Sequence, residues 1–366
     1  MTIFVFSIKK LISMVSNKNE LSFISKIILS VFIILSLFLL VLLYRSYNRI
    51  YRPNVILKGA ETAYIYIPTG STLEDVINIL YENNYIINRN SFEWLAEKKN
   101  YRIHVFPGRY KISNNMSNNK LLDLLRSGKQ EPVKLVFNNI RTKEQLAGKI
   151  SKQIEADSVS IMRLLNDPIF TEKYDLTTKT ISSIFIPNTY EFWWNTSAEK
   201  FIEKMHREYE TFWNENRLSK AKTLNLTKED VITIASIVDE ETIKNDEMDD
   251  IAGVYINRLR KRMPLQADPT IKFAIGDFTV KRILKVHLET DSPYNTYKFY
   301  GLPPGPISIP SIDAIDAVLN YDQHDYLYFC AKADFSGYHS FAKTLEQHNI
   351  NARAYQRALN KERIYK

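Results

Sequence analysis

The sequence predicts an α+β protein with three structured parts: a membrane-spanning helix near the N-terminus, a small βααβ domain, and a larger, mainly helical α+β domain that contains a long loop-rich segment. Three observations predict this class. A single apolar run lies near the N-terminus, a short strand–helix–helix–strand pattern follows it, and amphipathic helices of period about 3.6 occupy the second half. The expected boundaries are 1–26 for the N-terminal segment, 27–44 for the membrane helix, 45–62 for a linker, 63–130 for the small domain and 131–366 for the large domain.

Composition restricts the class of protein before any motif is considered. The chain has 366 residues, 49 Lys and Arg against 41 Asp and Glu, and one Cys. A single Cys excludes an internal disulfide framework and sites built from several cysteines, and the histidines show no HExxH or paired-ligand spacing. GxGxxG, P-loop and GxSxG motifs are absent from the sequence as well, so we expect neither a metal nor a cofactor. The net charge of +8 suits an anionic partner without selecting one.

The apolar run at 27–44 predicts a transmembrane helix. It has no charged residue, two serines interrupt it, and its length falls within the roughly 17–25 residues that span a bilayer. A signal peptide is the alternative, but its apolar core is only about 7–15 residues long and ends at a small-residue cleavage site, whereas this run ends in Tyr-Arg-Ser-Tyr. Lys and Arg are equally frequent on its two sides, so the positive-inside rule does not fix its orientation.

The segment after the linker predicts a compact module. The expected elements are a strand at 63–67, a helix from a capping box at 71–74 to about Glu82, a helix at 91–98 and a strand at 108–112. This βααβ order resembles LysM-type glycan-binding modules. A second copy is partly visible in a helix near 119–126, a strand at 133–137 and a helix that opens at Thr142.

The rest of the chain is expected to be mainly helical, with helices at about 197–215, 227–242 and 247–262. The stretch 264–310 is rich in proline and interleaved with apolar residues, and a long irregular loop in a compact domain is usually functional. A buried strand at 326–330 and a polar helix from about Asn349 follow. The basic run 258–262 favours a solvated helix C-terminus.

The sharpest chemical signal is an acidic cluster at the end of the helix that Thr227 caps. In VITIASIVDEET (231–242) the apolar residues share a face, Glu240 is expected to point to solvent, and Asp239 and Glu241 flank the apolar stripe. A carboxyl at the border of an apolar wall can have the raised pKa that a general acid needs. A polar helix end is the plainer interpretation, and the periodicity does not choose between Asp239 and Glu241.

Several motifs, taken in order, resemble those of the YceG-like endolytic murein transglycosylases. They are ASIVDEET (235–242), VYINRL (254–259), LQADPT (265–270), SPYNTY (292–297) and GLPPGPI (301–307). FIPNTYEF (185–192) resembles the FPDTY segment of the family, and the residues from His339 to Asn349 resemble its HxFxxT and HN tail. The family commonly reads ASIVEKET, with the catalytic glutamate second of the two acids, and that position is Glu241 here. Asp239 and Asn188 depart from the family pattern.

The resemblance implies a lyase that cleaves MurNAc–β-1,4–GlcNAc bonds within nascent peptidoglycan strands, forms 1,6-anhydroMurNAc ends and so terminates strand elongation. Glu241 would protonate the glycosidic oxygen and then serve as base on the C6 hydroxyl of the same sugar, which lies within the substrate at high effective molarity. The substrate contacts would come from Gln266, Asp268, Thr270, Tyr294, Asn295 and Tyr297. The implied partners are glycan strands, the membrane and a cell-wall synthesis complex, and not nucleic acid.

Two alternatives remain open. A lysozyme-like hydrolase would use Asp239 or Asp268 to position water, and a non-catalytic wall-binding scaffold would use the small LysM-like domain alone. An enzyme that cuts the wall must face it, so function rather than charge predicts 1–26 in the cytoplasm and the catalytic domain on the outer side of the cell membrane.

Overall fold

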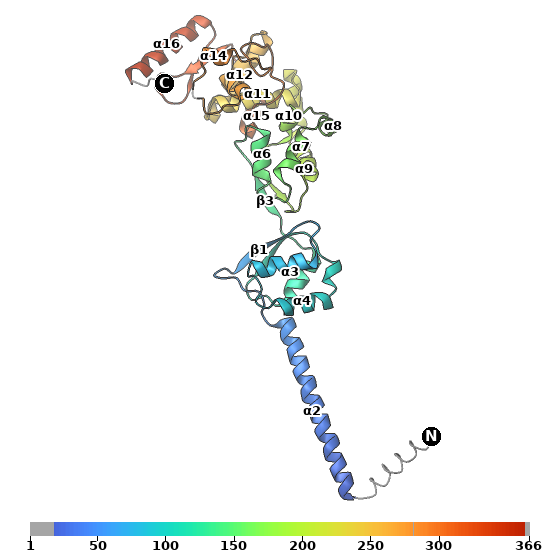
Figure 1. The fold of residues 1–366 in the computed structure, drawn as a ribbon. Coiled ribbons are helices and arrows are strands. Elements are labelled where there is room, and N and C mark those ends of the chain that lie inside the picture. Colours follow the sequence, from blue (N-terminus) through green and yellow to red (C-terminus); the bar gives the residue numbers. More distant parts are fainter. Residues whose placement is uncertain (1–17, 281, 363–366) are drawn as a thin grey trace. The chain divides into compact units, whose positions relative to one another are not determined.

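The computed structural model describes residues 18–280 and 282–362 and divides the chain into two compact units, 1–131 and 132–366 (Figure 1). The described residues form a mixed α+β, mostly helical structure with one N-terminal apolar helix, as the sequence predicts. Each unit has a hydrophobic core of its own. The strands in the described part pair as three antiparallel two-stranded sheets.

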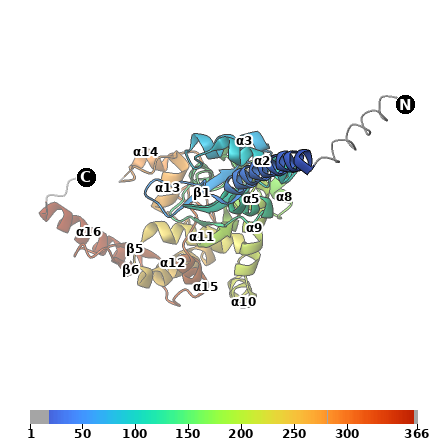
Figure 2. The ribbon, with the colours of Figure 1, turned by 90° about the horizontal axis from the view of Figure 1, so that it is seen from below.

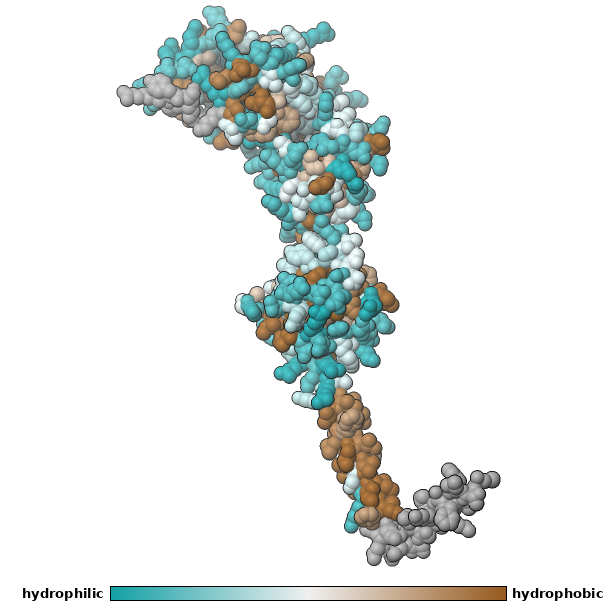
Figure 3. Space-filling model, viewed as in Figure 1, coloured by the Kyte–Doolittle hydropathy of each residue, from teal (hydrophilic) through white to brown (hydrophobic). Residues whose placement is uncertain are grey.

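Helix α2 (Lys18–Tyr51) extends beyond both ends of the predicted membrane span. Within its apolar portion, Phe23–Tyr51, an 18-residue window has a mean hydropathy of 3.1, and none of that window is buried within the protein. Apolar side chains therefore face outward along the helix, which Figure 3 shows as a continuous hydrophobic surface. A helix of this length and composition is compatible with a single-pass membrane anchor.

The first unit builds one strand–helix–helix–strand module. The two strands pair antiparallel, with Ile65 opposite Tyr110, and both side chains are buried in the unit's core. A capping box forms between Thr72 and Asp75, one residue later than the sequence predicts, because the Asp75 carboxylate accepts the Thr72 backbone N–H at 2.7 Å. The elements after α2 are β1 (Thr62–Ile67), α3 (Leu73–Glu82), α4 (Arg89–Lys98), η1 (Tyr101–Ile103), β2 (Gly108–Ser113) and α5 (Asn118–Ser127).

Two expectations for this region differ from the structure. The predicted linker is helical as far as Tyr51, and after it Val55 and Leu57 are buried in the core of the module. The partial second copy does not form, because α5 packs into the first unit whereas β3 (Val133–Val136) pairs with β4 (Thr189–Phe192) in the second. Local patterns identify the elements, but the pairing partner of a strand depends on distant sequence.

The second unit packs its helices around α11 (Lys228–Glu241). This helix contacts α12 (Met248–Arg260), α13 (Asp268–Ile275) and α15 (Ile312–Leu319), and every residue of 231–238 is buried. Residues 231–238 are thus buried on every face of the helix, and not only on the apolar face that the sequence predicts. The remaining elements are α6 (Lys143–Ile150), α7 (Ser158–Leu165), α8 (Pro168–Glu172), η2 (Ile181–Ile184), α9 (Ala198–Phe212), α10 (Glu215–Leu224), η3 (Asn245–Glu247), α14 (Lys285–Leu288), β5 (Tyr328–Ala331), β6 (His339–Ala342) and α16 (Leu345–Lys361).

The C-terminal part of this unit is a hairpin followed by a helix. Strands β5 and β6 pair antiparallel, and α16 lies along them (Figure 2). The strand predicted to be buried is only half-buried, since α16 and neighbouring loops cover the hairpin incompletely. The predicted loop-rich segment 264–310 contains α13 and α14 and is otherwise irregular.

One loop of that segment is held directly on α11. The backbone N–H of Ile307 donates to the Ser236 hydroxyl at 3.0 Å, and the Ser308 hydroxyl donates to the Ser236 carbonyl at 3.3 Å. Gly305 approaches the Lys179 carbonyl so closely that a Cβ atom would lie 2.3 Å from its oxygen. Only glycine therefore fits there without a shift of the backbone.

Candidate active site

Glu241 is the last residue of α11 and lies at the wall of two pockets. The helix ends there because Thr242 adopts an extended conformation, with φ −142° and ψ 148°. One pocket, of about 370 Å³, lies toward α12 and β5, and the other, of about 610 Å³, lies toward the turn after α11 and the β6 strand. Tyr255 of α12 donates its hydroxyl to Glu241 Oε1 at 2.7 Å. The central helix thus delivers one carboxyl group to the junction of two open spaces.

The surroundings of Glu241 favour its protonated form. Burial among protein atoms raises the pKa of Glu241, the hydrogen bond from Tyr255 opposes this rise, and the charge of Asp268 adds to it, so that the pKa lies at about 7. Burial also raises the pKa of Tyr255 well above its usual range, so this hydroxyl stays a donor. A carboxyl that titrates near neutral pH can both donate and accept a proton, which is the property of a general acid–base catalyst.

The two neighbouring acids have different partners. Asp239 accepts a hydrogen bond from Ser311, the N-cap of α15, and burial raises its pKa, although it too lines the larger pocket. Glu240 does not point freely to solvent as the sequence predicts. Its side chain is 22% exposed, and its two oxygens accept from the Arg141 guanidinium at 2.8 Å each. This long-range ion pair could not be read from the helical period.

Three of the predicted substrate-binding residues share the smaller pocket with Glu241: Gln266, Asp268 and Tyr297. The Tyr297 hydroxyl donates to Asp268 Oδ1 at 2.6 Å, which fixes both side chains at the pocket wall. Gln266 has a φ of +52°, and its side-chain oxygen accepts from the Arg258 guanidinium at 3.2 Å. These polar groups surround the space beside the carboxyl.

The other three predicted contacts lie away from that pocket. Thr270 and Asn295 are fully buried and bond to backbone carbonyls of their own loops, Thr270 at 2.7 Å and Asn295 at 2.8 and 2.9 Å. Tyr294 packs on Phe273 with ring centroids 4.6 Å apart. In this structure all three hold in place the segments that carry Asp268 and Tyr297.

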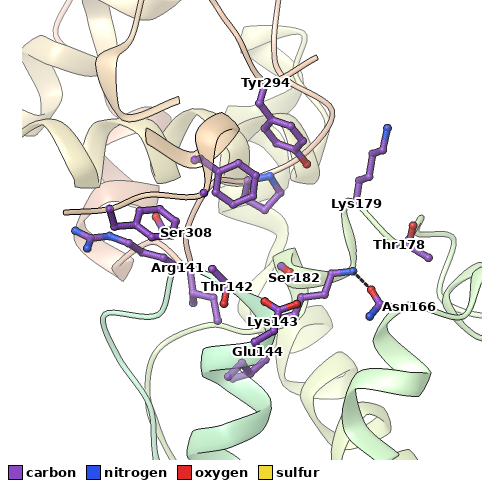
Figure 4. Close-up of a pocket in the computed structure, with 16 residues that line it drawn as sticks. Arg141, Thr142, Lys143, Glu144, Asn166, Thr178, Lys179, Ser182, Tyr294 and Ser308 are labelled. Atoms are coloured by element: carbon purple, nitrogen blue, oxygen red, sulfur yellow. Dashed lines mark hydrogen bonds between the residues drawn. The ribbon is translucent and has the colours of Figure 1, made fainter. Parts of the chain in front are cut away.

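Tyr294 lines a third pocket, of about 350 Å³ (Figure 4). There the Lys143 ammonium donates to Asn166 Oδ1 at 2.7 Å, and burial lowers the pKa of Lys143. The third pocket shares Arg141 and Ser308 with the 610 Å³ pocket, which in turn shares Glu241 with the 370 Å³ pocket. The three pockets therefore adjoin one another across common walls, an arrangement suited to a long polymeric ligand.

Sequence reasoning missed two residues at this site, Tyr255 and Arg258. The run that contains Arg258 was expected to be solvated, yet this side chain is only 6% exposed. Its guanidinium donates to the backbone carbonyls of Pro264, Leu265 and Leu327 at 3.0, 3.0 and 2.6 Å, so it fastens α12 to the loop before α13 and to the start of the hairpin. The available signal was the i, i+3 spacing, which places both side chains on one face of α12.

Within residues 18–280 and 282–362, no group of three or more His, Cys, Asp or Glu side chains is placed to hold a metal ion. The site presents a carboxyl with a raised pKa at the wall of pockets that share lining residues, and such a group is suited to proton transfer. A carboxyl of this kind in an α+β, mostly helical fold is compatible with an acid–base enzyme.

The chain belongs to the YceG-like family, whose model matches residues 65–354, and this confirms the resemblance inferred from its motifs. It is 32% identical over 306 residues to an endolytic murein transglycosylase of Bacillus subtilis, and the aligned part covers 79% of this chain and 83% of that protein. An endolytic murein transglycosylase of Streptococcus pneumoniae is 29% identical over 317 residues, or 78% of this chain and 57% of that one. The crystal structure of a YceG-like protein from Listeria monocytogenes superposes with a TM-score of 0.52 and 31% identity, covering 79% of this chain and 99% of that chain.

Proposed function

We propose that this protein is an endolytic murein transglycosylase. It cleaves MurNAc–β-1,4–GlcNAc bonds within nascent peptidoglycan strands, leaves 1,6-anhydroMurNAc ends and thereby terminates strand elongation. The observation that carries the proposal is the Glu241 carboxyl, with a pKa of about 7, at the junction of adjoining pockets. Membership of the YceG-like family and the named activity of the relatives from Bacillus and Streptococcus support the same reaction.

Glu241 acts first as an acid. Its proton passes to the glycosidic oxygen as the bond from C1 of MurNAc to that oxygen breaks, and the raised pKa keeps this proton available near neutral pH. The hydrogen bond from Tyr255 holds the carboxyl in place and stabilises the carboxylate that forms.

The C6 hydroxyl of the same MurNAc then attacks C1 and closes the anhydro ring. In the simplest scheme the Glu241 carboxylate also takes the hydroxyl proton, so one carboxyl serves both steps. A second carboxyl to activate water is not required, because the nucleophile is part of the substrate. Hydrolysis by contrast uses two carboxyls about 5–5.5 Å or 6.5–9.5 Å apart.

The polar groups of the 370 Å³ pocket bind the sugar. Gln266, Asp268 and Tyr297 hydrogen-bond to hydroxyl and acetamide groups, and the Tyr297 ring offers a stacking surface. Thr270, Tyr294 and Asn295 contribute indirectly by holding the loops that carry those contacts.

The first unit supplies location and affinity. Its βααβ order supports assignment as a LysM-like module that binds glycan, and α2 supports a single-pass anchor in the cell membrane with the catalytic domain on the outer side. The protein would there join the cell-wall synthesis complex. A reporter fused after Lys366 should be active outside the membrane, and activity only in the cytoplasm would exclude both this topology and the reaction.

The decisive test is the chemistry of the product. Full-length protein in detergent is incubated with purified glycan strands, and the fragment ends are identified by mass. Internal cleavage with anhydro ends is expected. Reducing ends would indicate a lysozyme-like hydrolase, and intact strands after prolonged incubation would indicate a wall-binding scaffold.

A further inference from the structure

A buried carboxylate holds a histidine at the larger pocket. Glu247 is 4% exposed, and its Oε1 accepts the backbone N–H of His339 at 2.6 Å while its Oε2 lies 2.8 Å from His339 Nδ1. The Thr242 hydroxyl, next to Glu241 in the chain, lies 3.4 Å from Oε2. The two oxygens of one carboxylate thus hold one histidine, Oε1 through its backbone and Oε2 through its ring, close to the residue that ends α11.

This contact determines which ring nitrogen carries the proton. A carboxylate only accepts, so Nδ1 of His339 carries the hydrogen, and in the neutral ring Nε2 is left as the acceptor. The edge-on contact with Phe329, with ring centroids 5.2 Å apart, also restricts the ring. The side chain remains 14% exposed and lines the 610 Å³ pocket together with Glu241.

We propose that His339 is the base of the ring-closing step, a role that rests on the transglycosylase reaction proposed above and replaces the second duty of Glu241 in the simplest scheme. A neutral imidazole oriented by a buried carboxylate is suited to this work, because the carboxylate stabilises the imidazolium that forms. Neither Glu247 nor His339 has any part in the acid step.

The proton balance of the step is complete. Glu241 gives its proton to the glycosidic oxygen, and the electron pair of the bond between C1 and that oxygen goes to the leaving hydroxyl. O6 forms its bond to C1, and its proton passes to Nε2 of His339. The imidazolium, paired with Glu247, then returns a proton to the Glu241 carboxylate directly or through water, which restores both groups.

The geometry of the product agrees with this assignment. The 1,6-anhydro bridge closes on the same face of the sugar from which the aglycone leaves, so the base must lie on the same side of the ring as the acid. Glu241 and His339 line one pocket, which is compatible with this requirement.

The test compares variants of the full-length protein by rate and by product. In His339→Ala and His339→Gln we expect anhydro products to form roughly 10²-fold or more slowly. The ratio of reducing to anhydro ends should rise as water competes with the unassisted C6 hydroxyl. Added imidazole should restore anhydro formation in His339→Ala, where it can enter the space, and not in His339→Gln.

Two further variants separate catalysis from structure. Glu247→Gln can still accept from one of the two His339 N–H groups, on the backbone or at Nδ1, but it loses the charge that stabilises the imidazolium, so we expect a smaller loss with the same drift toward reducing ends. Tyr338 lies beside His339 in the hairpin, and its hydroxyl donates an exposed hydrogen bond to Asp246. Tyr338→Phe removes this bond and should leave rate and products unchanged.

The outcomes distinguish this proposal from the proposed function. If the wild type forms anhydro ends and the His339 variants form them in an unchanged ratio without imidazole rescue, His339 is not the base and the reaction stands. If the wild type forms no anhydro ends, both fail. Should His339→Ala lose its near-ultraviolet circular dichroism, His339→Gln and Glu247→Gln decide, because each keeps a polar side chain of similar size to the one it replaces.

Discussion

The two units bury polar side chains in different ways. In the first unit Asn54, Asn118 and Ser91 form a buried network of neutral groups, with the Asn54 amide donating to Asn118 at 2.7 Å and the Asn118 amide donating to Ser91 at 2.9 Å. In the second unit, near the pockets, ionisable groups are paired as well, such as Glu241 with Tyr255 and Glu247 with His339. A neutral hydrogen-bonded network can only stabilise a fold, whereas an ionisable pair at a cavity wall can also exchange protons, as proposed for Glu241.

Glu241→Gln should produce the largest effect, because it removes the only proton that the proposed acid step uses. Gln keeps the shape and can still accept from Tyr255, but it cannot give up a proton, so the rate of strand cleavage should fall by about 10⁴-fold or more. Fragment formation is followed by mass on purified strands. The matched control is Glu229→Gln, which alters another Tyr–Glu pair on α11, the 2.9 Å bond to Tyr209, and should cut strands at the wild-type rate. Equal rates for the two variants would exclude Glu241 as the acid.

Asn118→Ala tests the neutral hydrogen-bonded network of the first unit. It leaves Asn54 and Ser91 without their buried partner, so the free energy of unfolding should fall by roughly 1–3 kcal/mol. Chemical denaturation measures this, and cleavage of short strands below the transition should be unchanged. Asn119→Ala, which loses an exposed bond to Asp123, should be nearly silent. A slower chemical step in the Asn118 variant would mean that the neutral network also serves catalysis.

Tyr255→Phe sharpens the assignment of the acid. The Tyr255 hydrogen bond lowers the pKa of Glu241, so its removal should raise that pKa above about 7. The protonated form would then persist to higher pH, and the basic limb of the pH–rate profile should move upward, while the rate near neutral pH falls several-fold because the acid is weaker. An unmoved basic limb would assign that limb to another group.

The smallest expected effect concerns stability. Because burial raises the pKa of Glu241 to about 7 from a usual value of 4.5, the folded state binds more protons than the unfolded state between those pH values. This group's contribution to the free energy of unfolding therefore falls as pH rises through that range and stays low above it. Glu241→Gln lacks this loss, so its melting temperature relative to wild type should be higher at pH 8 than at pH 4.5. An equal difference at both pH values would contradict the raised pKa.

Much of the fold could be predicted from local sequence. The start of α11 follows from Thr227, whose hydroxyl caps the helix, and the strands β1 and β2 follow from short apolar runs bounded by turns. The partner of β3 could not be predicted, because its pairing with β4 joins residues more than 50 positions apart. The failed second repeat is a consequence of that long-range pairing.

The candidate site, too, could be predicted only in part from the sequence. Periodicity indicated a carboxyl at the end of α11, and the resemblance to the family pointed to Glu241. The buried role of Arg258 was hidden, because the carbonyl of Leu327 that it bonds lies 69 residues away. The ion pair between Glu240 and Arg141 spans 99 residues and was hidden for the same reason.

The junction between α2 and the first module has a mechanical consequence. The Arg49 carbonyl, near the end of the helix, accepts the Asn118 amide at 2.9 Å, and the Arg49 guanidinium lies 5.3 Å from the Trp94 ring. The helix and the module are thus joined by contacts between side chains and backbone, not by a slack tether. With α2 in a bilayer, these contacts would hold the module close to the lipid surface. If the module binds glycan, as proposed above, it would then reach only strands that lie close to the membrane.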